Sequence, residues 1–289
     1  MSGEIPLLGG LSEIADNYDA FIIDIFGVVH NGIELFPDTI ETFQSLKEAG
    51  IQTCLLSNSP RRINGAMGQM EIMGLPRDAY DHAVTSGESA YETLKDRGGD
   101  LGDDCWFIGN DYVSEITQGI GLNIVSEPEQ ASFILNSIPG TEKSEVKTLK
   151  AQLQIAADKD LPMICANPDL VVNIGAHQYE CAGTFAALYE EMGGRVIYHG
   201  KPYAPVYERC HDLLGRPDKS KILAIGDAFH TDIAGANAFG IDSILNLTGI
   251  HWEEIAMDHA PTEADFPKLQ KLIATKEHKP NFAMGGFRW

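Results

Sequence analysis

The 289-residue sequence predicts an α/β protein: a doubly wound, mainly parallel core with a second α/β domain inserted into it. Two observations predict this class. Short apolar runs alternate with stretches of helical periodicity, as they do in βαβ units. This alternation occupies both ends of the chain, and a separate set of strands and helices lies between them. We therefore expect a core formed by residues 1–86 and 195–289, with the inserted domain at residues 87–194.

The N-terminal part of the core starts with Ala20-Phe21-Ile22-Ile23-Asp24, an apolar run typical of a buried strand. Proline in a first turn and glycine just after a last turn mark the ends of the helices that follow. On these signals, strands are expected at 20–24, 51–57 and 82–86, and helices at 37–49 and 61–73.

The same alternation continues toward the C-terminus, where strands are expected at 195–199, 222–227 and 242–247 and helices at 203–214 and 231–239. For the inserted domain the expected strands are 105–108, 133–136 and 163–166, and the expected helices are 143–158 and 181–192. The tail at 278–289 mixes glycine with aromatic residues, which indicates a docked or loosely ordered end.

The chain is acidic, with 42 Asp and Glu against 21 Lys and Arg and a net charge of −21. No basic run is longer than Arg61-Arg62, so we expect neither a nucleic-acid partner nor an anionic membrane partner. No apolar run approaches the roughly 18 residues of a membrane span. Residues 87–194 hold 6 basic and 18 acidic residues, a net charge of −12, so the inserted domain is the more acidic part.

The five cysteines are scattered and show neither a CxxC motif nor a zinc-like spacing, which is typical of reduced intracellular thiols. Residues 1–17 lack the basic and apolar regions of a secretory signal peptide. We therefore expect a cytoplasmic protein, and we leave open that it forms a homo-oligomer.

Carboxylates stand at the ends of two predicted strands. Asp24 ends the first strand, and Asp227 and Asp232 lie where the strand at 222–227 meets a helix. Open α/β sheets bind ligands at the carboxyl ends of their strands. Taken singly, Asp24 could cap a turn and Asp232 could belong to a helix N-cap. Together the three carboxylates offer hard oxygen ligands suited to Mg²⁺.

A second group of polar residues could bind an anion. Ser57, Asn58 and Ser59 lie between a strand and a helix, where hydroxyl and N–H groups suit an anion, although an ordinary N-cap has the same composition. Lys201 also lies between a strand and a helix. Its surroundings are no Walker loop, because Pro202 replaces the required Ser or Thr. A lone lysine is usually a solvated surface charge.

The order Asp24, Ser57, Lys201, Asp227/Asp232, each at the carboxyl end of a predicted strand, resembles the four motifs of the haloacid dehalogenase-like (HAD) hydrolase superfamily. The resemblance extends to its NagD-like subfamily IIA, whose Rossmann-like core carries a large α/β cap of the C2 type between the second and third motifs. The segments 166–169 and 181–183 look like parts of that cap, and the match covers roughly residues 18–249.

The resemblance implies a Mg²⁺-dependent phosphohydrolase acting on a small phosphorylated metabolite of the sugar phosphate or nucleotide type. Asp24 would attack the phosphoryl group and form an aspartyl-phosphate. Ser57 and the Asn58 amide would hold phosphoryl oxygens, Ser59 would contribute to substrate binding, and Lys201 would neutralise charge.

The same resemblance implies that Asp24, the Phe26 carbonyl oxygen and Asp227 hold the Mg²⁺ ion, with Asp232 as a ligand or as a partner of the ligands. From the cap, Asn167, Asp169 and the turn at 177–183 would contact the substrate.

One position departs from the pattern. Phosphatases of this superfamily usually carry a second Asp two residues after the nucleophile, which protonates the leaving group and then activates water; here that residue is Phe26. Such general acid–base help is typically worth about 10²- to 10⁴-fold in rate.

Three alternatives follow from Phe26. A phosphohydrolase could recruit another group, and His30 is the nearest candidate, on a flap whose Asn31-Gly32 pair is the signature of a type I′ hairpin; an exposed turn histidine fits the same pattern. A dehalogenase also lacks the second Asp, although the retained magnesium motif weighs against this activity. Finally, a catalytically impaired protein could bind a phosphorylated metabolite without turning it over.

Overall fold

The computed structural model describes residues 4–96, 101–174, 177–255 and 265–289. The chain divides into two compact units. The first unit comprises Met1–Ser57, Met67–Val84 and Tyr207–Trp289, and the second comprises Asn58–Ala66 and Thr85–Val206. The boundaries 1–86, 87–194 and 195–289 that the sequence suggests remain a proposal.

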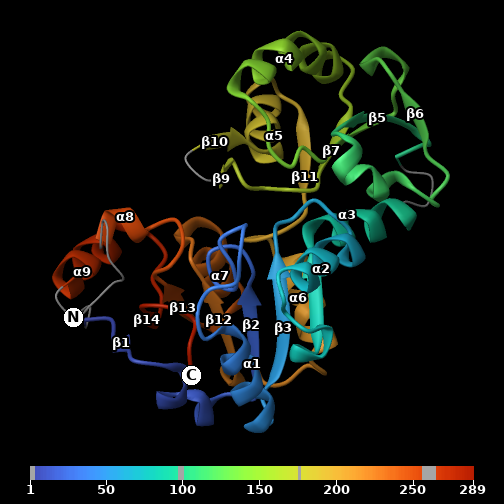
Figure 1. The fold of residues 1–289 in the computed structure, drawn as a ribbon. Coiled ribbons are helices and arrows are strands. Elements are labelled where there is room, and N and C mark those ends of the chain that lie inside the picture. Colours follow the sequence, from blue (N-terminus) through green and yellow to red (C-terminus); the bar gives the residue numbers. More distant parts are fainter. Residues whose placement is uncertain (1–3, 97–100, 175–176, 256–264) are drawn as a thin grey trace. The chain divides into compact units, whose positions relative to one another are not determined.

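The first unit is built on a seven-stranded sheet (Figure 1). All the pairings described between its strands are parallel. In spatial order the strands are β1 (Leu7–Leu8), β14 (Phe282–Met284), β13 (Asp242–Asn246), β12 (Ile222–Gly226), β2 (Ala20–Asp24), β3 (Gln52–Ser57) and β4 (His82–Thr85).

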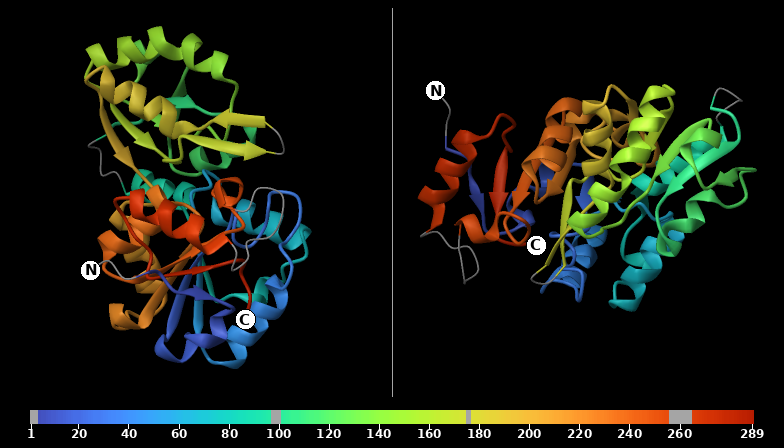
Figure 2. Two further views of the ribbon diagram at one scale, coloured as in Figure 1. Left: turned by 90° about the vertical axis from the view of Figure 1, so that its left-hand side faces the viewer. Right: turned by 90° about the horizontal axis from the view of Figure 1, so that it is seen from above.

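The two central strands, β2 and β12, correspond to unbroken apolar runs in the sequence. Every residue of β2 and of β12 is buried, as expected for a parallel sheet covered on both faces. From β2 the chain crosses to β3 on one side, and from β12 it crosses to β13 on the other. Right-handed crossovers therefore place α1 (Thr39–Glu48) and α7 (Ala234–Phe239) on opposite faces, as Figure 2 shows. The junction of β2 and β12 is thus the topological switch point of the sheet.

The second unit contains a five-stranded parallel sheet in the order β11 (Arg195–Tyr198), β8 (Pro162–Cys165), β7 (Phe133–Asn136), β5 (Asp104–Ile108) and β6 (Asn123–Val125). Successive residues of its strands enter two different hydrophobic clusters, because side chains alternate between the faces of a sheet. One cluster includes residues of α4 (Lys143–Asp158) and α5 (Ala182–Glu191), and the other includes residues of α3 (Ser86–Lys95). An antiparallel pair, β9 (Val171–Ile174) and β10 (His177–Glu180), completes the unit.

Within the described ranges, the other α-helices are α2 (Ile63–Ile72), α6 (Ala204–Leu213), α8 (Trp252–Ile255) and α9 (Phe266–Thr275). Short 3₁₀ segments lie at Leu11–Glu13, Ala15–Asn17, Arg77–Ala79, Asp111–Thr117, Pro128–Gln130 and Lys219–Lys221. All five cysteines are buried, and none of them is in a disulfide. Among the residues described, no helix combines the length and apolar character that a membrane crossing requires.

The fold class is the predicted one, but several elements differ from the sequence expectation. The tail contributes β14, which pairs between β1 and β13, and Phe287 is fully buried beside Phe43, so this end is docked in the sheet. The segment at 177–183 is no simple turn, because its first four residues form β10. The helix expected at 231–239 starts only at Ala234 and is preceded by a π-helical turn, Phe229–Ile233.

Candidate functional site

Asp24 is the last residue of β2, and its position follows from the strand pairing. Ile23 pairs with Ile225 of β12, so Asp24 and Gly226 end side by side at the switch point. Asp227 follows directly after β12 and therefore reaches the same edge of the sheet. Both carboxyl groups are buried, with 6% and 4% of their residue surface exposed.

Asp232 reaches the same place through the π-helical turn at Phe229–Ile233. Its Oδ2 accepts hydrogen bonds from the Ala228 N–H at 3.2 Å and the Thr231 hydroxyl at 3.3 Å. One carboxylate oxygen from each of Asp24, Asp227 and Asp232 lies within 4.8 Å of the others. The structure thus brings together the three carboxylates that the sequence singled out.

Three glycines make room for these carboxylates. A Cβ atom on Gly27 or Gly249 would overlap the carboxyl group of Asp227, and a Cβ on Gly226 would overlap that of Asp232. Gly27 also has φ +86°, a backbone conformation that favours glycine. Asp227 Oδ2 is further fixed by the Ile250 N–H at 2.9 Å.

Buried carboxylates this close repel one another unless a cation compensates them. Three carboxylate oxygens that lie this close together match the preference of Mg²⁺ for hard oxygen ligands. The residues present therefore fit a magnesium ion.

The loop after β2 is held by two residues that no sequence motif marks as part of the site. The carbonyl oxygen of Gly27 accepts hydrogen bonds from Asn246 Nδ2 at 3.1 Å and from Thr248 Oγ1 at 2.6 Å. Both donors lie at or just after the end of β13, which is adjacent to β12. Only the sheet order reveals this contact, because Gly27 and Asn246 are 219 residues apart in the sequence.

His30 is not the exposed turn residue that its surroundings suggested. It is 7% exposed, and its Nδ1 accepts a hydrogen bond from the Gly32 N–H at 2.7 Å. The predicted type I′ hairpin is also wrong: Gly32 has a positive φ but Asn31 does not, whereas that turn needs both. Instead, Asn31 Oδ1 accepts the N–H groups of Ile33 and Glu34.

This environment decides the protonation of His30. Burial lowers its pKa to about 4, so the ring is neutral near pH 7. Because Nδ1 is an acceptor, the proton of the neutral ring is on Nε2. In this arrangement His30 has no lone pair available to act as a general base.

The predicted anion-binding residues divide between the two units. Ser57 ends β3 in the first unit and is buried. Asn58, Asn167, Asp169 and Lys201 belong to the second unit, with Ser59. The structure brings Asn58, Asp169 and Lys201 together: the Asn58 side chain hydrogen-bonds the main chain of Lys201 and the carboxylate of Asp169.

The other two predicted substrate contacts have structural partners of their own. The side-chain oxygen of Asn167 accepts the Asp169 N–H at 3.1 Å, and Asn167 is buried. The Ser59 hydroxyl accepts the Arg61 N–H at 3.3 Å, and its carbonyl oxygen accepts the Ser86 hydroxyl at 2.9 Å.

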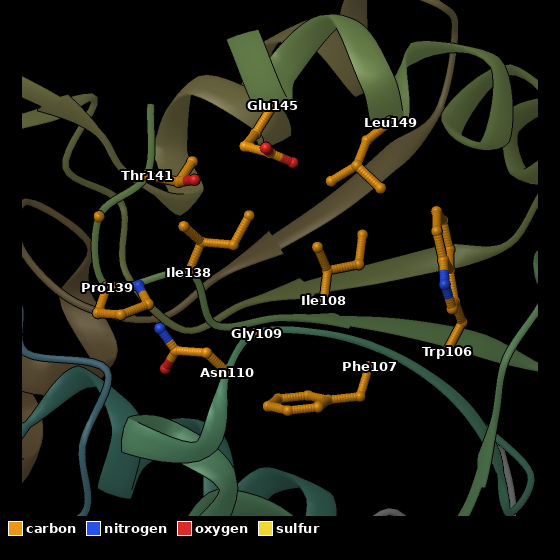
Figure 3. A pocket seen from close by; sticks show the side chains of 11 residues that line it. Trp106, Phe107, Ile108, Gly109, Asn110, Ile138, Pro139, Thr141, Glu145 and Leu149 are labelled. Carbon is orange, nitrogen blue, oxygen red and sulfur yellow. The ribbon is translucent and has the colours of Figure 1, made fainter. Parts of the chain in front are cut away.

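The second unit also contains a pocket of about 280 Å³ where β5 and β7 end beneath α4 (Figure 3). Trp106, Ile108, Ile138 and Leu149 point into it, and Glu145 lies at its rim. None of the site residues expected from the sequence lines this pocket.

Comparison with known proteins connects these features to a family. A family model described as haloacid dehalogenase-like hydrolase matches residues 21–123, and a second one, described as HAD-hydrolase-like, matches residues 198–272. The crystal structure of a haloacid dehalogenase-like hydrolase from Brucella suis is 31% identical, with a TM-score of 0.80 over 97% of this chain and 99% of that one.

More distant relatives span nearly the whole chain as well. The 5′-nucleotidase YutF of Bacillus subtilis is 24% identical over 255 residues, which is 86% of this chain and 94% of that protein. An acid sugar phosphatase of Staphylococcus epidermidis is 23% identical over 90% of this chain and 99% of its own length. A p-nitrophenyl phosphatase from Archaeoglobus fulgidus shares the fold, with a TM-score of 0.70 and 22% identity over 93% of this chain and 97% of its own.

Proposed function

Because the chain belongs to the haloacid dehalogenase-like hydrolase family, in its NagD-like subfamily, we propose that it is a Mg²⁺-dependent phosphatase acting on a small phosphorylated metabolite, of the sugar phosphate or nucleotide type. The observation that carries the proposal is the buried group of Asp24, Asp227 and Asp232 at the switch point of the sheet. Relatives that cover most of the chain are phosphatases of such substrates: a 5′-nucleotidase and an acid sugar phosphatase.

Asp24 is the proposed nucleophile. One of its carboxylate oxygens attacks the phosphorus atom, the phosphorus–oxygen bond to the leaving group breaks, and an aspartyl-phosphate forms. Water then attacks the phosphorus, which releases inorganic phosphate and restores Asp24. The second step cleaves the bond between phosphorus and the Asp24 oxygen, so the enzyme returns to its starting state.

Asp227, Asp232 and the carbonyl oxygen of Phe26 are the groups proposed to hold Mg²⁺ together with Asp24. The ion would neutralise negative charge on the phosphoryl group and on the nucleophile. The glycines at 27, 226 and 249 keep the carboxylates close enough to share one ion.

The remaining roles concern the phosphoryl oxygens. Ser57, Ser59 and the main-chain N–H of Asn58 are proposed to bind them at the start of the segment after β3, and Lys201 is proposed to supply a positive charge. Cap contacts by Asn167 and the segment 177–183 stay proposals for recognition of the leaving group.

Phe26 favours one second candidate, a protein that binds a phosphorylated metabolite without turnover. The family's usual acid–base carboxylate is missing there, and the neutral His30 beside it offers no replacement base. A dehalogenase is a weaker alternative, because three carboxylates gathered at the strand ends suit a metal-dependent phosphoryl transfer. A cytoplasmic location and a homo-oligomer stay predictions from the sequence.

The test is phosphate release from a panel of sugar phosphates, nucleotides and aryl phosphates, with and without Mg²⁺. Wild-type protein should release phosphate only with Mg²⁺, and Asp24→Asn should lower kcat by about 10³-fold or more. Asp16→Asn, an exposed carboxylate in the same unit, is the matched control and should leave kcat unchanged. Binding of substrates without Asp24-dependent turnover would support the second candidate, and halide release from a 2-haloacid without Mg²⁺ would support the dehalogenase.

A further inference from the structure

The side chain of Asn58 makes three hydrogen bonds within the second unit. Its Oδ1 accepts the main-chain N–H of Lys201 at 2.7 Å. Its Nδ2 donates to the carbonyl oxygen of Lys201 at 3.2 Å and to Asp169 Oδ1 at 2.8 Å. Asn58 and Lys201 are 6% and 3% exposed, so water does not replace these bonds easily.

Only an amide of this length satisfies all three partners. Lys201 presents one donor and one acceptor, which match the oxygen and the nitrogen of the Asn58 amide. The second hydrogen of Nδ2 meets the Asp169 carboxylate. The flipped amide would set a donor against the Lys201 N–H and an oxygen against the carboxylate, so the orientation is fixed by chemistry.

The backbone at Gly200 leaves room for the contact between Asn58 and Lys201. Gly200 has φ +122°, and a Cβ there would lie 2.6 Å from Asn58 Oδ1 and 2.7 Å from Pro168 Cδ. A glycine therefore lets three segments approach closely: the one after β3, the loop containing Pro168, and the turn before Lys201.

Asp169 is in turn held in place from its own loop. Its N–H donates to Asn167 Oδ1 at 3.1 Å, and its carbonyl oxygen accepts the Gly183 N–H at 3.0 Å. The residue is partly buried, and one of its carboxylate oxygens is engaged by Asn58. This hydrogen bond turns the carboxylate of Asp169 toward Asn58.

We propose that Asn58 is a positioning residue that fixes the main chain of Lys201, and that Asp169 acts through Asn58 rather than by contacting the substrate. The inference rests on the proposed function, in which Lys201 compensates the phosphoryl charge. An error of about 1 Å in such a group can cost about 10²-fold in rate, so the hydrogen bonds on its main chain matter for kcat.

The test is a double-mutant cycle that exchanges the amide at position 58 and the carboxylate at position 169, and each variant is assayed by Mg²⁺-dependent phosphate release. Asn58→Asp keeps the acceptor for the Lys201 N–H but sets a carboxylate against both Asp169 and the Lys201 carbonyl oxygen. We expect kcat to fall about 30-fold or more, with a smaller change in KM.

The double variant Asn58→Asp/Asp169→Asn removes the repulsion between the two carboxylates. The amide introduced at position 169 can donate to the carboxylate introduced at position 58, and kcat should recover at least about fivefold. In Asp169→Asn alone, the introduced amide can turn its oxygen toward Asn58, so kcat should fall by no more than about threefold and KM should stay at the wild-type value.

The matched control is Asn136→Asp. Asn136 is another fully buried asparagine of the second unit, and its Nδ2 donates at 2.8 Å to the carbonyl oxygen of Ala182, at the start of α5 rather than in the turn of Lys201. It reports the general effect of a buried Asn→Asp change: a lower Tm, with kcat of the folded protein retained. All variants are compared below their Tm, with folding checked by circular dichroism.

Several outcomes overturn the inference. If Asn58→Asp keeps the wild-type kcat, or loses no more than Asn136→Asp, Asn58 does not position Lys201. If the double variant is no better than Asn58→Asp, Asp169 does not act through Asn58. If Asp169→Asn raises KM with kcat unchanged, Asp169 contacts the substrate directly. Should Asn58→Asp fail to fold, Gly200→Ala, which presses on Asn58 Oδ1, must show the same selective loss of kcat. A wild-type protein without Asp24-dependent turnover would instead contradict the proposed function itself.

Discussion

The imidazole of His30 meets the ring of Phe26 edge-on, with the ring centroids 5.6 Å apart and the planes at 85°. The two side chains occupy the loop in which the resemblance to the HAD hydrolases leads us to expect an acid–base carboxylate at position 26. Gly32 packs against the Phe26 ring, and a Cβ atom at position 32 would lie 3.1 Å from that ring. An aromatic contact between Phe26 and His30 thus fills this part of the loop, and the contact supplies no carboxylate that could donate a proton to the leaving group.

A first prediction concerns the leaving group. Without a proton donor at position 26, the rate should depend strongly on the acidity of the leaving alcohol, so aryl phosphates should react much faster than alkyl phosphates. Phe26→Asp should raise kcat for alkyl phosphates by about 10-fold or more and change aryl phosphates little. Steady-state kinetics on both substrate classes measure this difference. A loss of activity on both classes would mean that the aromatic ring itself assists the reaction.

A second prediction separates His30 from the chemistry. In His30→Asn the side-chain oxygen can take over the hydrogen bond from the Gly32 N–H, so the loop keeps its shape. We expect kcat within about threefold of wild type and an unchanged pH profile. A drop of about 10²-fold or more, with loss of one limb of the profile, would identify His30 as the missing acid–base group.

A third prediction uses the glycines around Asp227. Gly249→Ala places a methyl group against the Asp227 carboxylate and should abolish both Mg²⁺-dependent activity and the rise in Tm on adding Mg²⁺. Gly68→Ala is the control, because a Cβ there meets nothing within 4 Å and the residue lies inside α2. It should keep activity and gain about 0.5–1 kcal/mol of stability from helix propensity. Normal Mg²⁺ response in Gly249→Ala would place the metal elsewhere.

A fourth prediction concerns acid stability. His199 is 4% exposed, its Nδ1 lies 3.0 Å from the Ser89 hydroxyl, and burial lowers its pKa to about 4 from the ordinary 6.5. The unfolded chain thus binds a proton more tightly than the folded one between these values. The stability that the neutral ring contributes is complete above pH 6.5 and is lost as the pH falls to about 4, up to about 3 kcal/mol.

Thermal unfolding across this pH range tests the assignment. His199→Gln should reduce the slope of Tm against pH between about 6.5 and 4, leaving the part due to His30, whose pKa burial also lowers to about 4; His177→Gln, at an exposed position, should leave the slope unchanged. Equal slopes in wild type and His199→Gln would show that other groups govern acid unfolding.

Local pattern was sufficient for the strands and helices with strong periodicity. The runs at 20–24 and 133–136 and the helix at 143–158 have the bounds that the sequence predicts. Strand β14 was missed because three residues near a glycine-rich end carry little signal, and only the edge offered by β13 makes them a strand. The helix α3 was missed because it begins at the expected domain boundary, although Thr85 is its N-cap and accepts the Glu88 N–H.

Some residues of the candidate site could be predicted from the sequence, and others could not. Asp24, Asp227 and Asp232 could be predicted because each stands near the end of a strand, and parallel strands meet at one edge. The contacts of Asn246 with Gly27 and of Asn58 with Lys201 could not, since they depend on which segments the fold places side by side. His30 was misjudged because a turn motif predicts exposure, whereas tertiary packing buried the ring against Phe26.

The most direct measurement is mass spectrometry of the protein quenched in acid during turnover of an aryl phosphate with Mg²⁺. One phosphoryl group should be found on the peptide containing Asp24, should disappear when substrate is exhausted, and should be absent from Asp24→Asn. Steady turnover with an unmodified Asp24 peptide, or turnover by Asp24→Asn at the wild-type rate, would contradict the assignment of Asp24 as the nucleophile.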